Sequence, residues 1–412
     1  MTDLWVYNRA QALFSKTVYY RRTLHEHPEL SFHEVETANF IANELSTIEG
    51  MDVQIGIGLK TAVIGTISGG KGPIVGIRSD IDALPIHEQN DCAYCSRNEG
   101  VMHACGHDAH MSIALSVAHL IGEAWKLGKL QGTVRFLFQP AEETTNETGK
   151  TGAQYLIEAG VLDDLDALFA LHMMPQYPVG NVLVPDGYCT ANVDEFTVKI
   201  QGAGGHGAYP HLGKDPIWML GSVLQTMQGI VAREISPLEP AVVSVCHVHA
   251  GDEKTNNVIP SEVTLGGTFR SYSPAVRQRL VQRFEDVLSI VKPLGGTYAL
   301  QVNHGEPSVY NHPQLADVLR STIEKQLPTI RILPDTFGLG GEDFAHMARL
   351  VPSAMFFLGC AKDDGVRRDL HAPIFDLDER SLLTGVTVLA GALLNLFDHP
   401  ERIPRKQKAT QK

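Results

Sequence analysis

The stretch Met102-His103-Ala104-Cys105-Gly106-His107-Asp108-Ala109-His110, continued by Met111-Ser112-Ile113-Ala114-Leu115, decides how this chain is interpreted. Histidines, a cysteine and an aspartate crowd together, and an apolar helical pattern follows at once. Because one glycine separates Cys105 from His107, a thiolate and an imidazole can turn toward one point at the start of a helix. Such a pair suits a transition metal such as zinc. A structural cysteine beside ordinary histidines explains a single pair better, so the metal hypothesis depends on ligands further along the chain.

Length and composition limit the classes of protein to consider. A chain of 412 residues is too long for one ordinary core, which predicts two domains. The content of 43% hydrophobic and 20% charged residues is typical of globular enzymes. The net charge of −13, without a compensating basic stripe, argues against nucleic acid or an anionic membrane as a partner.

Targeting signals and cysteines predict a reduced, cytoplasmic protein. Residues 1–20 lack the continuous apolar run of a secretory signal, and no run of about eighteen uncharged apolar residues predicts a transmembrane helix. Six cysteines in so long a chain do not resemble a disulfide framework. Cys92-x-x-Cys95 looks like half of a metal knuckle without a second pair, and we interpret it as a coincidence with no redox role.

The first helix is predicted from about Leu4 to Leu24 and ends near His25-Glu26-His27-Pro28, because proline stops a helix. We interpret the two histidines there as hydrogen-bonding surface residues rather than metal ligands. Ser31-x-x-Glu34 has the pattern of a capping box and predicts the start of a second helix through Ile41 and Leu45.

Polar side chains recur where buried strands end. Asp80 and Asp82 follow a strand at 74–77, Glu142 and Glu143 follow a strand at 132–139, and His172 follows a strand at 166–171. Taken singly, an Asx turn or a solvated acidic turn explains the carboxylates equally well or better. Open α/β sheets bind ligands beyond the carboxyl ends of their strands, so the repetition predicts a site there. One of the two glutamates can bind a metal ion while the other acts as a general base on the attacking water.

The pattern changes from Asn192. Strands at 196–200, 241–248, 263–270 and 297–302 alternate with helices at 215–233 and 274–291 in the order β-α-β-β-α-β. This order is typical of a ferredoxin-like unit. We therefore predict a catalytic domain in two parts, 1–187 and 304–412, with an inserted domain at 188–303.

Further candidate residues lie in the inserted domain and after it. Glycines bracket His206 in the run Gly204-Gly205-His206-Gly207, which suggests close approach to a ligand. Asn257 and Arg270 belong to the same domain. Near the C-terminus, Glu342 opens a short helix, and His371 precedes a long apolar helix at 379–397 and is a candidate last ligand.

With these motifs in place, the sequence resembles the amidohydrolase branch of the dinuclear-metal aminoacylase and carboxypeptidase clan. That branch contains hippurate hydrolases, N-acyl-amino-acid amidohydrolases, plant auxin-conjugate hydrolases and N-acetyldiaminopimelate deacetylases. The resemblance runs from His25-Glu26-His27-Pro28-Glu29-Leu30 to His371-Ala372-Pro373. It implies an α/β fold: a zinc-peptidase-like α/β/α catalytic domain with an inserted ferredoxin-like α+β domain that serves as lid and dimerisation domain.

The resemblance also implies roles for individual residues. Glu142 is the general base, Asp82 an orienting acid, and His206 helps to polarise the scissile carbonyl, in several relatives from the partner subunit of a dimer. Two divalent ions, zinc or manganese with cobalt or nickel also permitted, are implied in each subunit. The implied substrate-binding residues are Asn257, Arg270 and Glu342, and the implied metal ligands are Cys105, His107, Glu143, His172 and His371.

One departure from the wider clan bears on the metal. The peptidases of the clan have His-x-Asp where this chain has Asp80-x-Asp82, and an aspartate where it has the segment Cys105 to His107. The amidohydrolase branch shares this change, which is therefore compatible with activity. A thiolate among imidazoles and carboxylates suits zinc and permits the other metals.

From the residues and the resemblance we expect a metal-dependent hydrolase that cleaves N-acyl amino acids, such as N-acetyl or N-benzoyl compounds, into a carboxylic acid and a free amino acid. A homodimer or higher homo-oligomer through the inserted domain is expected. Three alternatives remain: a carboxypeptidase or dipeptidase on the same site, an N-acetyldiaminopimelate deacetylase, and a binding protein without activity. The retained Glu142 and the complete set of ligands argue against the last.

Overall fold

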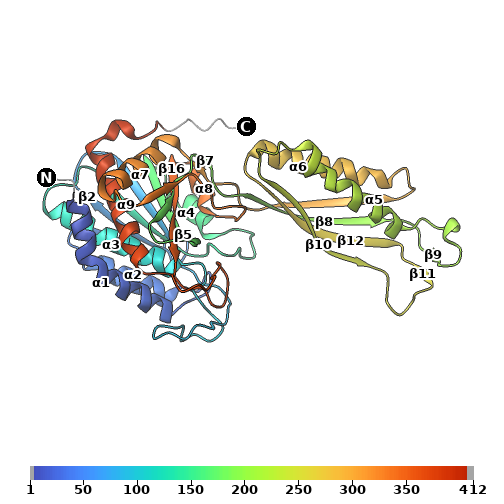
Figure 1. Ribbon diagram of the computed structural model, residues 1–412, viewed down its shortest axis with the longest axis horizontal. Coiled ribbons are helices and arrows are strands. Elements are labelled where there is room, and N and C mark those ends of the chain that lie inside the picture. Colours follow the sequence, from blue (N-terminus) through green and yellow to red (C-terminus); the bar gives the residue numbers. More distant parts are fainter. Residues whose placement is uncertain (1–3, 406–412) are drawn as a thin grey trace. The chain divides into compact units, whose positions relative to one another are not determined.

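A computed structural model describes residues 4–405 of the chain, which divides into two compact units (Figure 1). Unit 1 comprises Met1–Gly187, Val309–Phe337 and Asp343–Lys412, within the described residues. Unit 2 comprises Tyr188–Ser308 and Gly338–Glu342. The second unit is thus inserted into the first along the chain, as the predicted α/β fold with an inserted domain requires.

Unit 1 is built on a mixed sheet. Strands β3, β4, β5 and β16 at its centre are parallel, and the pairs β1–β2, β2–β4 and β16–β6 are antiparallel. The central strands are buried on both faces, which explains their continuous apolar sequences. In spatial order the strands are β1 (Met51–Ile55), β2 (Val63–Ser68), β4 (Thr133–Gln139), β3 (Ile74–Asp80), β5 (Ala167–Pro178), β16 (Ser353–Ala361), β6 (Asn181–Leu183) and β15 (Arg331–Leu333).

Helices cover this sheet (Figure 1). Among residues 4–405, α9 is long and apolar enough to cross a membrane by length and composition alone, but 78% of its apolar window is buried inside the protein. It packs against α1, α3, α7 and β16, as a core helix does. The helices are α1 (Trp5–Glu26), α2 (Val35–Ser46), α3 (His107–Lys126), α4 (Gly152–Glu158), α7 (Pro313–Gln326), α8 (Phe344–Ala348) and α9 (Arg380–Asp398).

Unit 2 has the predicted ferredoxin-like topology. Its antiparallel sheet has the order β10-β12-β8-β13, and α5 and α6 pack on it around Phe196, Phe269 and Phe284. Asp215 and Ser273 cap the two helices, each followed by a proline at the first helical position. The elements are β8 (Asn192–Gln201), β9 (Gly205–His206), α5 (Pro216–Gly229), β10 (Ala241–Ala250), β11 (Val258–Ile259), β12 (Glu262–Ser271), α6 (Pro274–Leu288) and β13 (Thr297–His304).

Local predictions in unit 1 fail at particular residues. Ser31 and Glu34 do not form a capping box, because both side chains bond to other segments. The carboxylate of Glu29 instead accepts the N–H groups of Glu36 and Thr37 in the first turn of α2. His25 is not a surface residue, because it lies buried at the end of α1 between Asp108 and Glu88. In each case the side chain bonds to a residue far away in the sequence, and local propensity cannot reveal such a partner.

Two further differences concern β5 and the cysteine pair. β5 continues to Pro178, so His172 lies inside the strand, opposite Phe357 of β16, and not beyond its end. Cys92 and Cys95 are joined in a disulfide, so their spacing is not a coincidence. Cysteines three residues apart can meet when the chain between them turns, as it does at Ala93 and Tyr94.

Candidate metal centre and active site

A glycine turn brings Cys105 and His107 to one place. Gly106 has φ 92°, a left-handed conformation that favours glycine, and a Cβ there would lie 2.9 Å from the Cγ of Met173. His107 is the first residue of α3, and its Nδ1 lies 2.9 Å from the carbonyl oxygen of Asp82. That contact orients the ring so that Nε2 is available for a metal ion.

The five predicted ligands converge within unit 1. Their donor atoms fall into overlapping groups of three whose members all lie within 4.8 Å of one another. The Sγ of Cys105 belongs to two of these groups, and lies 3.4 Å from Nε2 of His172 and 3.4 Å from Nε2 of His371. The groups are Cys105–His107–His172, Cys105–Glu143–His371 and, with the predicted base, His107–Glu142–Glu143.

Unpaired buried atoms show that a divalent cation fits here. Nε2 of His107 and Oε1 of Glu143 are buried and make no hydrogen bond among the described residues, although Oε1 lies 3.3 Å from Nε2 of His371 and 3.8 Å from Nε2 of His107. Leaving such atoms unpaired is costly, and a metal ion would satisfy both at once. The donor set combines a thiol, imidazoles and a carboxylate, which zinc prefers and which manganese, cobalt and nickel also accept.

The electrostatics of the cluster favour a positive ion. Burial and the carboxylates of Glu143 and Glu142 raise the pKa of the Cys105 thiol well above its ordinary value, so a thiolate there needs a nearby cation. Burial lowers the pKa of His107, but the carboxylates of Asp80 and Asp82 outweigh it and raise the pKa to about 10. Burial and neighbouring His110 hold the pKa of His172 well below its usual range, so this imidazole is neutral, the form that binds metals.

Asp82 and Asp80 support the cluster from the end of β3. Oδ2 of Asp82 accepts the hydroxyl of Ser31 at 2.6 Å and the backbone N–H of Glu143 at 3.0 Å, so this carboxylate holds a predicted ligand in place. Oδ1 of Asp80 lies 2.6 Å from Nδ1 of His110. His110 in turn accepts the N–H of Met173 at 3.0 Å.

Glu142, the predicted base, is half-buried and reaches a buried ionic network. Its Oε1 accepts the backbone N–H of Asp343 at 3.4 Å. The Asp343 carboxylate accepts Nη2 of Arg78 at 2.6 Å and Nε2 of Gln139 at 2.8 Å. Arg78 also donates to Asp80 at 2.6 Å. One buried guanidinium therefore connects Asp80, which supports the predicted ligands, with Asp343, which contacts the predicted base.

The turn that presents the two glutamates is held from the N-terminal segment. Ala141 has φ 51°, an unusual value for a residue with a side chain. Its N–H donates to Oε1 of Glu34 at 2.9 Å, while Oε2 of Glu34 accepts the hydroxyl of Thr61 at 2.8 Å. The same Oε1 accepts the N–H of Phe32, at 2.9 Å, another residue with positive φ.

In unit 2, the structure brings His206 and Asn257 together. His206 of β9 pairs with Val258 of β11, and Gly207 donates its N–H to the carbonyl of Asn257 at 2.7 Å. Both residues line an open hollow of about 790 Å³, and the His206 side chain is exposed.

Arg270 does not join that pair. The segment with His206 and Asn257 lies beside the start of β12 at Glu262, and Arg270 lies eight residues further along the strand, or about 26 Å at roughly 3.3 Å per residue. Glu342 is buried in unit 2, where its charge raises the pKa of Cys189 beyond the effect of burial. The predicted substrate-binding residues of one chain therefore do not form one cluster within this unit.

Several supporting residues were named from the sequence without a role, or were missed. His110 lies in the same motif as His107, and Asp80 in the same motif as Asp82. This closeness to a predicted site residue was the available signal. Asp343 follows Glu342 directly. Glu34 was noticed, but its pattern with Ser31 pointed to helix capping.

Comparison with known proteins supplies the family. Residues 76–395 match Peptidase family M20/M25/M40. Thermostable carboxypeptidase 1 of Saccharolobus solfataricus is 36% identical over 91% of this chain and 93% of its own length. N-acetyl-L-cysteine deacetylase of Bacillus subtilis is 37% identical over 92% of this chain and 88% of its own length.

A solved structure agrees. The Bacillus subtilis YXEP protein, described as a dinuclear metal binding peptidase from the M20 family, is 33% identical, covers 94% of this chain and 99% of its own, and has a TM-score of 0.82. The predicted fold class and the predicted kinship with amidohydrolases are both confirmed. The chain therefore belongs to Peptidase family M20/M25/M40, and the relatives named above are hydrolases that act on amide bonds.

Proposed function

We propose that this enzyme cleaves the amide bond of N-acyl amino acids, releasing a carboxylic acid and a free amino acid, with two divalent metal ions in each subunit. One observation carries the proposal: Glu142, next to the predicted ligand Glu143, shares a group of donor atoms with His107 inside the cluster centred on Cys105. A carboxylate that lies next to a set of metal ligands is suited to act as a general base.

The predicted ligands Cys105, His107, Glu143, His172 and His371 would hold the ions. Bound divalent ions supply Lewis acidity toward a carbonyl oxygen and lower the pKa of water. Asp82 keeps the backbone of Glu143 in place and, through its carbonyl, the ring of His107. The network of Arg78 and Asp343 limits the movement of the Glu142 carboxylate.

Glu142 is the proposed proton carrier. It accepts the proton of the attacking water at a carboxylate oxygen and later delivers that proton to the nitrogen of the leaving amine. The leaving group of an N-acyl amino acid is the amino acid itself, so the proton ends on its amino group. His206 is proposed to donate to the carbonyl oxygen as negative charge develops there.

The separation of residues in unit 2 supports a homodimer. Arg270 is the proposed carboxylate-binding residue. It lies eight residues along β12 from Glu262, or about 26 Å at roughly 3.3 Å per residue, and Glu262 lines the same hollow as His206. An N-acyl amino acid is too short to reach both within one unit 2. We therefore propose that His206 acts from the partner subunit, with Asn257 beside it and Glu342 supporting the segment that leads to Asp343.

The experiment for the substrate class is hydrolysis by metal-reconstituted enzyme of N-acetyl, N-benzoyl and indole-acetyl amino acids, N-acetyldiaminopimelate and dipeptides, followed by release of free amine. Zinc and manganese are loaded separately, and bound metal is measured. The proposal expects fast cleavage of one acyl class with dipeptides untouched. No cleavage of any acyl compound by a protein with both ions bound would refute it.

A second experiment tests the role of His206. Chains carrying Glu142→Gln and chains carrying His206→Ala are mixed after dissociation and reassociated. A mixed dimer has one site with Glu142 from one chain and His206 from the other, so activity should return if His206 acts across the dimer. Mixtures no more active than the separate variants would show that His206 acts within its own chain.

The alternative favoured by a specific observation is a carboxypeptidase or dipeptidase, because one relative at 36% identity is named as a carboxypeptidase. The same residues would serve in the same roles, and preferred cleavage of dipeptides would identify it. An N-acetyldiaminopimelate deacetylase would show strong selectivity for that compound within the panel. A cytoplasmic location stays a prediction, to be tested by fractionation.

A further inference from the structure

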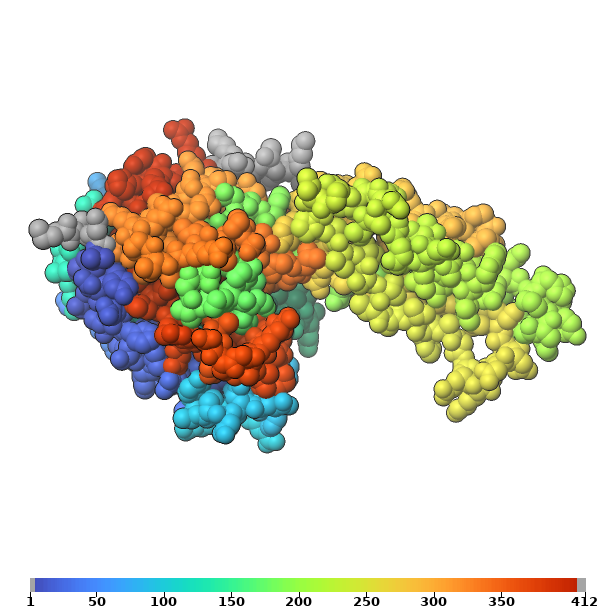
Figure 2. All heavy atoms as spheres, viewed as in Figure 1, coloured from blue at the N-terminus to red at the C-terminus, as the bar shows by residue number. Residues whose placement is uncertain are grey.

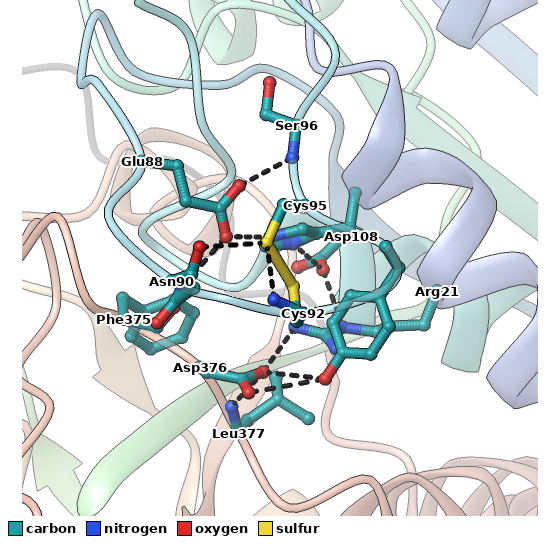
Figure 3. The surroundings of a disulfide bond; sticks show 12 residues. Arg21, Glu88, Asn90, Cys92, Cys95, Ser96, Asp108, Phe375, Asp376 and Leu377 are labelled. Carbon is teal, nitrogen blue, oxygen red and sulfur yellow. Dashed lines mark hydrogen bonds and ion pairs between the residues drawn. A yellow bond between two sulfur atoms is a disulfide. The ribbon is translucent and has the colours of Figure 1, made fainter.

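The disulfide between Cys92 and Cys95 lies in an irregular loop of unit 1, residues 85–101, that the proposed chemistry does not use (Figure 3). Both cysteines are half-buried, so small thiols in solution can reach them. Cys105, Cys189 and Cys360 are buried free thiols, and Cys246 is an exposed one. Among the described cysteines, Cys92 and Cys95 are thus set apart by being joined to each other, and they are more accessible than the three buried thiols.

The loop is closed on itself and anchored to α1 by Glu88. One carboxylate oxygen of Glu88 accepts the N–H of Ser96 at 2.6 Å, and the other accepts the side-chain amide of Asn90 at 2.9 Å. Nε2 of the buried His25 lies 3.1 Å from Glu88. Between Asn90 and Ser96, the disulfide of Cys92 and Cys95 closes a smaller, covalent ring within the loop that Glu88 closes.

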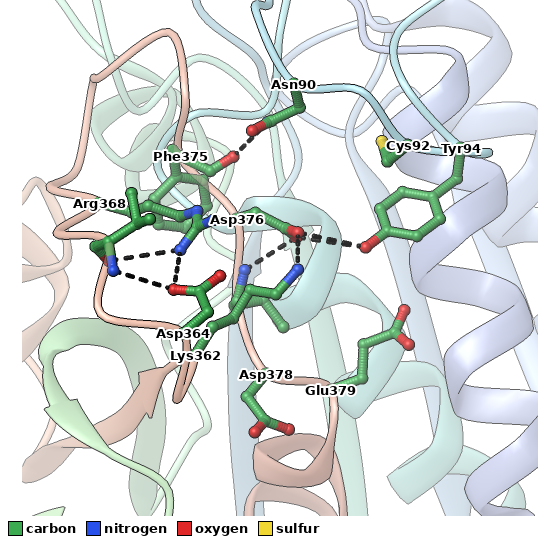
Figure 4. Close-up of polar contacts among 12 residues, drawn as sticks. Asn90, Cys92, Tyr94, Lys362, Asp364, Arg368, Phe375, Asp376, Asp378 and Glu379 are labelled. Carbon is green, nitrogen blue, oxygen red and sulfur yellow. Dashed lines mark hydrogen bonds and ion pairs between the residues drawn. The ribbon is translucent and has the colours of Figure 1, made fainter.

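The closed loop holds the segment Pro373–Asp376 (Figure 4). Gln89 donates its N–H to the carbonyl of Pro373 at 2.8 Å. The side chain of Asn90 donates to the carbonyl of Phe375 at 2.8 Å, and the hydroxyl of Tyr94 lies 3.3 Å from the carboxylate of Asp376. Tyr94 stands between the two cysteines in sequence, so the disulfide restricts the backbone from which this contact is made.

That segment continues directly from His371, the most exposed of the proposed ligands. The His371 side chain is 51% exposed, whereas that of Glu143 is 10% exposed. Its backbone has φ 61°, which costs free energy unless neighbouring contacts hold it. The N–H of His371 donates to the carbonyl of Ala104 at 2.8 Å, and that of Ala372 to Asp369 at 3.3 Å; the loop with the disulfide then contacts Pro373. Figure 2 shows that loop, in cyan, at the surface of unit 1 below the orange-red C-terminal segments.

We propose that Cys92 and Cys95 form a thiol–disulfide modification site, and that the disulfide form holds His371 in its metal-binding position. This inference rests on the proposed metal centre. The oxidant is a small-molecule disulfide: one cysteine thiolate attacks it and releases one thiol, and the second cysteine then displaces the other. Two electrons pass from the cysteine pair to the small disulfide, and the two protons end on the released thiols.

The predicted cytoplasmic location favours a reversible site. Disulfides in cytosolic proteins are usually transient or redox-sensing rather than permanent, because the thiol pools there reduce them. In the dithiol form the loop keeps the contacts of Glu88 but loses the covalent closure around Tyr94. The dithiol enzyme then has a less constrained His371 and binds one of its metal ions more weakly.

The first test measures the redox state itself, independently of metal and activity. Trypsin cleaves after Arg78 and Arg97, so one peptide carries both Cys92 and Cys95 and no other cysteine. Full-length protein is equilibrated with reduced and oxidised glutathione at set ratios, alkylated under denaturing conditions and analysed by mass spectrometry. The pair should convert between a dialkylated peptide and a disulfide peptide. A peptide that stays dithiol under oxidised glutathione would overturn the proposal.

The second test measures metal affinity by competition with a chelating dye, for zinc and for cobalt. The disulfide form should bind the weaker ion about tenfold more tightly than the dithiol form, as supporting residues of metal sites typically affect affinity. The double variant Cys92→Ser/Cys95→Ser should bind like the dithiol form and ignore reductant, which controls for chelation by the reductant. Cys246→Ser, which removes the exposed free thiol, should respond like the wild type.

The remaining outcomes separate the two proposals. Equal affinity in both redox forms, with the peptide converting normally, would refute the link to His371 and leave the metal centre intact. Absence of metal binding in either form would refute the metal centre, and the link with it. A third zinc ion in the dithiol form that is lost in the double variant would overturn the redox site and make Glu88, Cys92 and Cys95 a metal site instead.

Discussion

Glu34 accepts the backbone N–H of Ala141 at 2.9 Å, across more than a hundred residues of sequence. Ala141 precedes the two glutamates of the site and has φ 51°. A residue with a side chain in this conformation needs contacts that hold it there. The buried carboxylate of Glu34 thus positions the turn from which Glu142 and Glu143 extend.

Glu34→Ala is expected to lower kcat by about 10- to 100-fold, because a small displacement of a catalytic group is costly. Glu34→Gln should retain most of the activity, since its amide oxygen still accepts the N–H of Ala141 and its amide nitrogen can donate to Thr61. Steady-state kinetics with measured metal content checks both variants. If Gln is as damaging as Ala, the carboxylate has a role beyond holding the turn.

Glu34 also predicts how stability depends on pH. Burial, and next the carboxylate of Asp82, raise the pKa of Glu34 from 4.5 to about 7. Between these values the unfolded chain has lost the proton that the folded protein keeps, so stability falls as pH rises through this window. The full loss is about 3 kcal/mol at roughly 1.4 kcal/mol per pKa unit.

Denaturant unfolding of metal-free wild type and Glu34→Gln, compared from pH 4.5 to 8, measures this contribution. The advantage of the variant should grow with pH and level off above about pH 7, because glutamine does not ionise. Parallel curves for the two proteins would show that Glu34 keeps an ordinary pKa in the fold.

Glu142→Gln should bind metal as the wild type does and lose about 100- to 10,000-fold in kcat, the usual contribution of a general base. Glutamine cannot take the proton of water, while the proposed ligand Glu143 is unchanged. Metal analysis and single-turnover rates check the two parts separately. Near-normal turnover would remove Glu142 from the proposed mechanism.

The pair Arg78–Asp343 predicts a large loss of stability. Arg78→Met leaves the buried carboxylates of Asp80 and Asp343 without their guanidinium, which costs about 3–5 kcal/mol. Lys126→Met removes an exposed ion pair with Glu49 and should cost less than about 1 kcal/mol. Urea unfolding of both variants makes the comparison. Similar losses in the two would mean that the buried network is worth no more than a surface pair.

Cys105→Ser should weaken the binding of both proposed metal ions by about tenfold or more, because its Sγ belongs to two groups of donor atoms, one with His107 and His172 and one with Glu143 and His371. Cys189→Ser is the matched control, since Cys189 is also a buried free thiol but lies in unit 2. Titration of the metal-free proteins with zinc gives the two affinities. Weakening at a single position would show that the thiolate serves one ion alone.

The sequence predicted much of the fold, and it named candidate ligands that the structure brings together, for physical reasons that lie in local pattern. Helix α3 begins at His107 and ends at Lys126, as the apolar period after Gly106 predicted. The β-α-β-β-α-β order of unit 2 followed from strand and helix periods alone. Cys105 and His107 could be paired because one glycine forces them to the same turn.

Only the tertiary structure decided which distant groups support that site. Ser31 and Glu34 have the local pattern of a helix cap, yet their oxygens bond to Asp82 and Ala141, because a buried N–H or carboxylate takes whichever partner the packing brings near. Arg78 meets Asp343, and the loop of Cys92 and Cys95 meets the segment after His371, across more than two hundred residues. Periodicity describes which face of an element is buried, but not which element will lie against it.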